Sequence, residues 1–312
     1  MQAIMQEEWN GPDSVRLVET PDPHPAPTEV RIRVHAAGVN PVDYYTSRGL
    51  AYNRVLELPF IHGWDVAGVV DEIGYGVSRF QVGDRVFGMP WFPRQAGGYA
   101  EFATAPSRHF ATMPGGVSFA EAAALPLAGL TAWQMLVDVA HIATGQRVLV
   151  SAAAGGVGHL AVQIAKACGA YVIGTARAAK HDFVRALGAD EVVDYTATPV
   201  HEVVSDVDVV IQMFGGDAGR EALNCLRPNG ILVSAQAAWT PGLAERANEL
   251  NVEAHDYLVE PDATGLEAVA DLVAEGKVKV HIAAEYPLSE AAQALQAISN
   301  GRTSGKIVLT AV

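Results

Sequence analysis

Cysteine is scarce in this sequence, with only Cys168 and Cys225 among 312 residues. Two thiols exclude a disulfide framework and any zinc site built from four cysteines, and they suit the reducing cytoplasm. Basic residues are also few, since 21 Lys and Arg stand against 35 Asp and Glu, for a formal net charge of −14. Such a surface repels the phosphates of nucleic acids and of anionic lipids, so both are poor partners.

Long hydrophobic runs are missing as well. The uncharged, largely apolar stretch Ala122 to Val137 is shorter than the ~18–20 apolar residues that span a bilayer, and Pro126 and Gly129 interrupt it. The sequence begins Met1-Gln-Ala-Ile-Met-Gln-Glu-Glu8, with acidic residues where a signal peptide needs positive charge. We therefore expect no membrane span, no cleaved leader and a cytoplasmic location.

The composition is that of a globular protein, because half of the residues are hydrophobic and only 18% are charged. The length favours two domains. In the first 110 or so residues, short alternating or apolar segments bounded by Gly and Asp predict an irregular, mostly antiparallel β-fold. The predicted strands are Glu29–His35, Val66–Ile73 and Asp84–Gly88.

From about Ser118 the pattern changes to Ala-rich helical segments and then to alternating apolar strands and amphipathic helices, which predicts a doubly wound parallel sheet of five strand–helix units. The strands are Arg147–Ser151, Tyr171–Thr175, Glu191–Asp194, Val207–Met213 and Ile231–Ala235. After Asp262 we expect helical segments at Leu266–Glu275 and Pro287–Ser299, and a final strand Lys306–Thr310 that returns to the first domain. The predicted domains are residues 1–123 with 263–312, and residues 124–262.

A glycine-rich turn follows the first of these strands, in Val148-Leu-Val-Ser-Ala-Ala-Ala-Gly-Gly-Val-Gly158. Gly155 and Gly156 allow a tight turn and close approach to a pyrophosphate, and Gly158 lets the next helix pack on the strand. The helix N-terminus offers its N–H groups to the anion. The pattern departs from G-x-G-x-x-G because Ala152 stands first. It predicts a dinucleotide site, although other α/β enzymes have similar strand-to-helix turns.

The segment Gly174-Thr-Ala-Arg-Ala-Ala-Lys180 closes the second strand and bears on the choice of cofactor. A carboxylate there binds the adenine ribose of NAD, whereas cations accept the 2′-phosphate of NADP. No acidic residue occurs before Asp182, and Arg177 lies 22 residues after Gly155. Arg177 and Lys180 can clamp a dianionic phosphate, which favours NADPH. The alternative is a solvated helix start with incidental positive charge.

Several motifs, in order along nearly the whole chain, resemble the zinc-independent medium-chain dehydrogenase/reductases, specifically the quinone oxidoreductase (zeta-crystallin-like) family. They are Ala37-Gly-Val-Asn-Pro-Val-Asp43, Leu58-Pro-Phe-Ile-His-Gly-Trp-Asp-Val-Ala-Gly68, Val82-Gly-Asp-Arg-Val86, Gly98-Tyr-Ala-Glu101, Ala128-Gly-Leu-Thr-Ala132, the glycine turn, Leu187-Gly-Ala-Asp190, Leu226-Arg-Pro-Asn-Gly230 and Gly305-Lys-Ile-Val-Leu309. The resemblance implies a Rossmann domain joined to a chaperonin-10-like (GroES-like) β-domain that the C-terminus completes, with the active site in the cleft between them.

The resemblance also implies that no catalytic metal is bound. In the zinc alcohol dehydrogenases of this superfamily a Cys stands at the position of Asn40, and a His-Glu pair stands at Trp64 and Asp65. Neither Asn nor Trp replaces a thiolate or imidazole ligand. His62 lies nearby, but a lone His is more often a packing or pocket-lining residue than a metal ligand.

For NADPH, the resemblance implies a set of contacts spread over both domains. Asn40 and Thr131 are expected beside the nicotinamide, and Phe214 and Gly215 beside its ribose. The rest of the predicted set comprises Gly155, Gly156 and Val157 at the pyrophosphate, Thr175, Arg177, Lys180 and Tyr195 around the 2′-phosphate, and Lys306 on the terminal strand. Ordinary structural roles stay open, because Asn40 can cap a turn, Thr131 can cap a helix and Phe214 can belong to the core.

The expected chemistry is hydride transfer from NADPH to a quinone or similar conjugated acceptor, with orientation and exclusion of water as the main contributions of the protein. Tyr52 lies near the position of a proton-donating Tyr in related enoyl reductases, offset by one residue. Tyr44 and Tyr45 compete for this role, and all three can instead be walls of the acceptor pocket. An enoyl or 2-alkenal reductase and a non-catalytic nucleotide-binding protein remain alternatives.

We also expect a homodimer. The segment Ile231–Ala235 is predicted to be the last strand of the parallel sheet, and an open sheet edge must be covered. The same edge of a second copy can cover it in a two-fold interface. Alternatively, residues 242–253 of the same chain lie over it.

Overall fold

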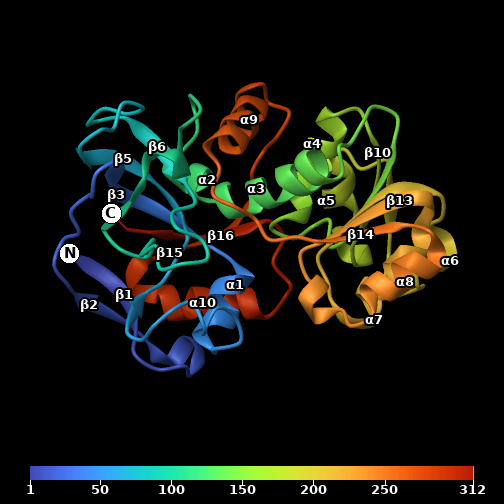
Figure 1. The fold of residues 1–312 in the computed structure, drawn as a ribbon, viewed down its shortest axis with the longest axis horizontal. Helices are drawn as coiled ribbons and strands as arrows, with labels where there is room; N and C mark the ends of the chain where they lie inside the picture. The colour runs from blue at the N-terminus through green and yellow to red at the C-terminus, as the bar shows by residue number, and fades with distance from the viewer. Residues whose placement is uncertain (312) are drawn as a thin grey trace. The chain divides into compact units, whose positions relative to one another are not determined.

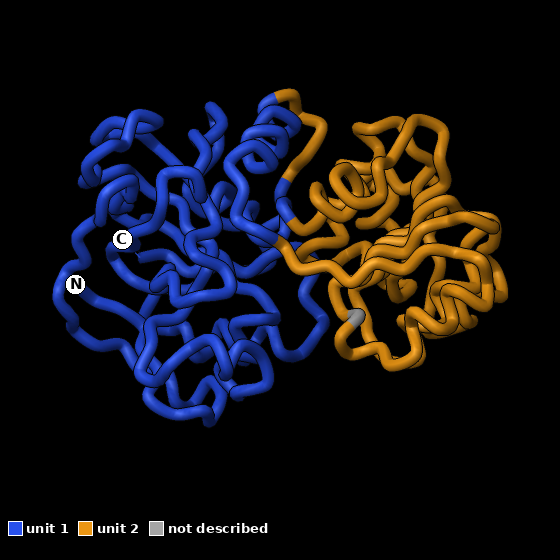
Figure 2. The backbone as a smooth tube through the Cα atoms, in the orientation of Figure 1, with its two compact units in different colours: residues 1–130, 260–274, 280–312 blue, residues 131–259, 275–279 orange. Residues whose placement is uncertain are grey.

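The computed structural model describes residues 1–311, apart from the side chain of Ala237. The chain divides into two compact units (Figure 2). Unit 1 contains Met1–Leu130, Glu260–Ala274 and Val280–Val312, and unit 2 contains Thr131–Val259 and Glu275–Lys279. The predicted domain boundaries lie after residues 123 and 262, and they remain a prediction.

Unit 1 is built from two sheets. A three-stranded sheet has the order β2-β1-β4, and a seven-stranded sheet has the order β15-β16-β3-β5-β6-β8, with β7 also paired to β3. The strands are β1 Gln2–Gln6, β2 Val15–Glu19, β3 Glu29–Val39, β4 Phe60–Ile61, β5 Asp65–Ile73, β6 Arg85–Gly88, β7 Phe102–Pro106, β8 Phe110–Thr112, β15 Ile282–Pro287 and β16 Lys306–Thr310. The helices that begin in unit 1 are α1 Pro41–Ser47, α2 Phe119–Ala123, α3 Pro126–Trp133, α9 Ala263–Ala274 and α10 Ala291–Ser299.

The long strand β3 organises this unit. Its alternate residues Val30, Ile32 and Val34 are fully buried in the core, as the period of two predicts. Strand β3 pairs antiparallel with β5, β7 and β16. The prediction that the terminal strand returns to the first domain is therefore confirmed, because Ile307 stands opposite Val39.

Unit 2 contains one parallel sheet of order β11-β10-β9-β12-β13-β14. Counted along the chain this is 3-2-1-4-5-6, the doubly wound order that confirms the predicted Rossmann fold. The strands are β9 Arg147–Val150, β10 Tyr171–Thr175, β11 Glu191–Val193, β12 Val207–Gln212, β13 Leu226–Ser234 and β14 Glu253–Asp256. The helices are α4 Gly158–Ala167, α5 His181–Ala186, α6 Val200–Val203, α7 Gly216–Glu221 and α8 Leu243–Leu250. Figure 1 shows α4 and α5 on one face of the sheet, and α7 and α8 on the other.

The prediction that Ile231–Ala235 forms the sheet edge is wrong. Strand β14 pairs in parallel with β13, from Ile231 opposite Glu253 to Ser234 opposite Asp256. The sheet has six strands instead of five, and β14 is its edge. The segment Glu253-Ala-His-Asp256 escaped prediction because an edge strand with mainly polar side chains lacks an apolar pattern.

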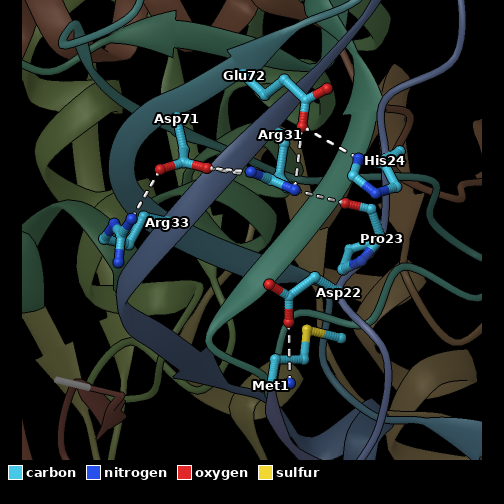
Figure 3. Close-up of polar contacts among 8 residues, drawn as sticks. All are labelled: Met1, Asp22, Pro23, His24, Arg31, Arg33, Asp71 and Glu72. Carbon is cyan, nitrogen blue, oxygen red and sulfur yellow. Dashed lines mark hydrogen bonds and ion pairs between the residues drawn. The ribbon is translucent and has the colours of Figure 1, made fainter.

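The loop between β2 and β3, which contains Pro21, Pro23, Pro25 and Pro27, is tied to its surroundings in unit 1 by polar contacts (Figure 3). The Met1 ammonium lies 2.9 Å from an oxygen of Asp22. Arg31 of β3 donates to the Pro23 carbonyl at 3.1 Å and pairs with Asp71 of β5 through two nitrogens, at 2.9 and 2.5 Å. Because Arg31 and Asp71 are mostly buried, their pairing fixes the guanidinium more firmly than an exposed ion pair does, and the bond of this guanidinium to the Pro23 carbonyl ties the loop to the sheet.

Within residues 1–311, none of the helices has the length and apolar character that crossing a bilayer requires.

Candidate functional site

Two of the predicted site residues, Asn40 and Lys306, meet inside unit 1. Asn40 precedes α1 and Lys306 opens β16, so the pairing of β16 with β3 brings them together across 266 residues of sequence. The Lys306 Nζ donates to Asn40 Oδ1 and, at 3.2 Å, to the Val39 carbonyl. Both side chains are buried.

A third residue completes this group. The Asn40 Nδ2 donates to Asp65 Oδ2 at 2.8 Å, and the Lys306 Nζ lies 3.5 Å from the same oxygen. The other oxygen of Asp65 accepts the Leu127 N–H at 2.7 Å. Burial raises the pKa of Asp65, while the nearby Lys306 ammonium opposes this rise. The three side chains form a buried carboxylate–amide–ammonium group, which we call the Asn40 group.

A second buried carboxylate lies beside it. Asp43 Oδ2 accepts the backbone N–H of Asn40 at 2.7 Å and the Tyr99 hydroxyl at 2.8 Å, whereas its Oδ1 has no hydrogen-bond partner. Burial raises the pKa of Asp43 to about 7, although both donors oppose the rise. Two carboxylates therefore share one buried ammonium, and protonation of Asp43 brings the formal charge of Asp43, Asp65 and Lys306 to zero.

The predicted proton donor Tyr52 lies in an aromatic cluster. Its ring makes edge contacts with Phe92 at 5.4 Å and with Trp64 at 6.1 Å between ring centroids. Trp64 is oriented by its indole N–H, which donates to the Arg94 carbonyl at 2.7 Å. Burial raises the pKa of Tyr52 to about 12, so the phenol keeps its proton at neutral pH. This cluster is joined to the Asn40 group through the adjacent residues Trp64 and Asp65.

In unit 2, the glycine turn connects β9 to α4, and Gly158 is the glycine that the packing of α4 requires. A Cβ atom on Gly158 would stand 2.1 Å from the Ala152 carbonyl oxygen, so only glycine allows α4 to begin there. Ala152 itself adopts φ +50°, a conformation that costs a non-glycine residue roughly 1 kcal/mol. Gly155, Gly156 and Val157 are partly accessible, whereas the next residues of α4 are buried.

Of the two cations predicted at the end of the second strand, Arg177 contacts Tyr195 and Lys180 interacts with Arg177. The Arg177 Nε donates to the Tyr195 hydroxyl at 3.2 Å, and this pair joins the ends of β10 and β11. Burial lowers the pKa of Lys180, and the neighbouring charge of Arg177 lowers it further. Arg177 and Tyr195 are exposed. We call these three residues the Arg177 cluster, and its donors suit an anionic group.

Exposed apolar side chains gather at the same edge of the sheet. Tyr195, Phe214, Trp239 and Leu258 follow the carboxyl ends of β11, β12, β13 and β14 in turn, and each is at least 40% exposed. Gly215 packs against Trp239, because a Cβ on Gly215 would approach the Trp239 backbone and side chain within 2.9 Å. Ligands of open α/β sheets bind at the carboxyl ends of strands, so this is the expected binding edge.

The two predicted threonines are buried. The Thr175 hydroxyl accepts a hydrogen bond from the Ala152 N–H at 3.3 Å, and the Thr175 carbonyl accepts one from the Ala153 N–H at 2.9 Å. It therefore holds the start of the glycine turn. Thr131 lies in α3.

Asp65, Asp43 and Tyr99 were missed as members of the site. One signal was available, since Asp65 interrupts the apolar run Phe60-Ile-His-Gly-Trp-Asp-Val-Ala-Gly-Val-Val70. A charged residue in a buried strand needs a partner. The sequence does not indicate which partner, because Lys306 is distant along the chain.

No three His, Cys, Asp or Glu residues within 1–311 are arranged to hold a metal ion. His62 is buried, with Nε2 against Gln6 Oε1 and its ring 4.6 Å from that of Phe60. Burial lowers the pKa of His62 to about 3. It is a packing residue that follows β4 and contacts β1 through Ile4 and Gln6.

Comparisons with known proteins cover almost the whole chain. An alcohol dehydrogenase GroES-like domain model matches residues 26–132, and a zinc-binding dehydrogenase model matches residues 187–309. The chain is 36% identical to a chloroplast envelope quinone oxidoreductase homolog of Arabidopsis thaliana, over 99% of this chain and 98% of that protein. It is 34% identical to the quinone oxidoreductase of Mus musculus, over 99% and 97%.

Solved structures agree with these matches. The quinone oxidoreductase of Coxiella burnetii superposes with a TM-score of 0.94 at 35% identity, covering 100% of this chain and 99% of that one. The Escherichia coli quinone oxidoreductase complexed with NADPH gives a TM-score of 0.90 at 29% identity, with 100% of each chain covered. With its GroES-like and Rossmann units and its full-length relatives, the chain belongs to the quinone oxidoreductase family of the medium-chain dehydrogenase/reductases.

Proposed function

We propose that this protein is an NADPH-dependent quinone oxidoreductase that acts without a metal ion. The Arg177 cluster is the observation that favours NADPH over NADH, because it brings a guanidinium, a phenol and an ammonium to the end of the second strand of the Rossmann sheet. Such a donor set matches the 2′-phosphate of NADPH.

The remaining residues of unit 2 fit a dinucleotide. The absence of a side chain at Gly158 lets α4 start against the Ala152 carbonyl, and we assign the partly accessible residues Gly155, Gly156 and Val157 to the pyrophosphate. Phe214 and Gly215 lie at the same edge, where we assign them to the nicotinamide ribose. We assign Thr175 to holding the turn and Thr131 to the nicotinamide side.

In unit 1, we assign Asn40 and Lys306 to orienting the nicotinamide end of the cofactor, and Tyr52 to the acceptor. When bound, NADPH supplies a hydride equivalent to the quinone. The product also needs a proton, and we assign its delivery to Tyr52, which is protonated at neutral pH but which burial makes a weaker acid, with its pKa raised to about 12. Trp64 and Phe92 pack edge-on against Tyr52 and each other, and we assign this aromatic cluster to one side of the acceptor site.

NADPH oxidation followed with 1,4-benzoquinone, 2-alkenals and enoyl thioesters tests this function. The quinone should give the highest kcat/KM. A preference for 2-alkenals or enoyl thioesters would instead establish the enone reductase alternative. Tight NADPH binding without turnover of any acceptor would contradict an enzymatic role and favour a nucleotide-binding protein.

We also propose a homodimer and a cytoplasmic location. The exposed edge strand β14 replaces Ile231–Ala235 as the strand that a second copy would cover. The two free thiols, Cys168 and Cys225, support a reducing compartment.

A further inference from the structure

The side-chain amide of Asn40 is held at both of its ends. Its Nδ2 donates to Asp65 Oδ2 at 2.8 Å, and its Oδ1 accepts a hydrogen bond from the Lys306 Nζ. A carboxylate only accepts and an ammonium only donates, so the two partners fix which way the amide faces. Without both partners the amide can rotate by 180° at little cost.

Asp65 is itself fixed on both oxygens. Oδ1 accepts the Leu127 N–H at 2.7 Å, while Oδ2 faces Asn40 and Lys306. The backbone leaves room for this carboxylate, because a Cβ on Gly38 would stand 2.8 Å from Asp65 Oδ2 and 2.4 Å from the Ala123 carbonyl oxygen. The chain thus builds a close-fitting site around one charged side chain that is fully buried.

The charge of Asp65 also compensates that of Lys306. Lys306 is 2% exposed, and its Nζ contacts only neutral acceptors apart from Asp65 Oδ2 at 3.5 Å. A buried ammonium without a counter-charge loses its proton or draws its side chain toward solvent. The position of Lys306 therefore depends on Asp65 as much as that of Asn40 does.

We propose that Asp65 is a positioning residue for the reductase reaction, which fixes the Asn40 amide and the Lys306 ammonium in the orientation that the bound nicotinamide needs. This inference rests on the proposed function, which assigns Asn40 and Lys306 to the nicotinamide end. Asp65 acts through these two side chains and touches neither cofactor nor acceptor. Its loss should affect turnover more than cofactor affinity, because the Arg177 cluster holds the opposite end of the cofactor.

The substitution D65N tests the proposal, since it replaces an acceptor by an NH2 donor that faces two other donors. We expect kcat with NADPH and quinone to fall at least about tenfold, while the Kd of NADPH changes less than about threefold. The matched control is D71N, because Asp71 lies on the same strand β5 but pairs with Arg31 and Arg33 and has no contact with the Asn40 group. D71N should retain kcat within about twofold.

A second measurement does not depend on turnover. The fluorescence lifetime of bound NADPH reports the surroundings of the nicotinamide, and it should differ between D65N and the wild type but not between D71N and the wild type. Unchanged lifetime and unchanged kcat in folded D65N would refute a positioning role and leave Asp65 as a structural residue. If the wild type reduces no acceptor, the proposed function fails, and the lifetime still decides the positioning role.

D65E covers the case in which D65N does not fold. Glutamate keeps the charge that compensates Lys306 but displaces the carboxylate by one methylene group. A positioning role predicts a reduced kcat and an altered lifetime in D65E. Full activity of D65E with a wild-type lifetime would show that charge alone matters and would overturn the proposal.

Discussion

The Nε of Arg177 lies 3.2 Å from the hydroxyl of Tyr195, to which it donates a hydrogen bond. This contact joins the ends of the neighbouring strands β10 and β11, and Lys180 is close enough to Arg177 for their charges to interact. The cluster leads to a direct prediction about nucleotide selectivity.

R177A should weaken NADPH binding by about 1.5–3 kcal/mol, the range for a charge-assisted contact, and leave NADH binding nearly unchanged. Fluorescence titration of both nucleotides measures this. R185A is the matched control, because Arg185 is exposed in the same unit and pairs only with Asp182 of its own helix. Equal dissociation constants of the wild type for NADPH and NADH would count against the assignment.

Asp43 should make the protein less stable as the pH rises. Its pKa is raised from 3.8 to about 7 in the folded state, so the folded chain binds one proton more than the unfolded chain between these values. This contribution is complete below about pH 4 and is lost as the pH rises through 7, by about 4 kcal/mol in all. Urea unfolding of wild type and D43N at several pH values should show the difference, and parallel pH profiles would refute it.

His62 should make the protein less stable as the pH falls. Its pKa is lowered from 6.5 to about 3, so the unfolded chain binds the extra proton between these values. The stability that neutral His62 contributes is complete above pH 6.5 and is lost toward pH 3, with about 3 kcal/mol gone by pH 4.5. H62Q, which keeps an amide near Gln6 but cannot titrate, should lack this loss. A wild-type profile that matches H62Q from pH 7 to 4.5 would contradict the burial of a neutral imidazole.

Activity should survive exhaustive chelation, because Asn40 and Trp64 stand where zinc ligands occur in related alcohol dehydrogenases. The Asn40 amide already bonds Asp65 and Lys306, and the Trp64 indole bonds the Arg94 carbonyl. Metal analysis of protein purified without added metal checks this independently. Stoichiometric zinc would overturn it.

Light scattering at micromolar concentration tests the dimer. We expect a mass near twice that of one 32.9 kDa chain. A mass near one chain would refute the dimer and leave the hydride-transfer function untouched. If the dimer forms through β14, replacing Ala254 by proline should shift it toward monomer, because proline removes a backbone donor from the edge.

The sequence alone determined the features that depend on neighbouring residues. The glycine turn, the strand before it and α4 after it were predictable because their main requirement is local, namely the absence of a side chain at Gly158. The left-handed φ at Ala152 was not predicted, because an alanine rarely adopts it. The alternation of strands and helices likewise predicted the parallel sheet, since short connections leave few topologies open.

Tertiary structure alone decided the partners of the buried charges and the edge of the sheet. Asp65 stands out in its apolar strand, but its partners Asn40, Leu127 and Lys306 come from three distant segments that only the folded sheet brings together. Strand β14 contains almost no apolar residues, so its side-chain pattern does not predict a strand. It forms because β13 offers backbone hydrogen-bonding groups along its edge. Long-range pairing of this kind depends on the geometry of the backbone, which no local pattern of side chains encodes.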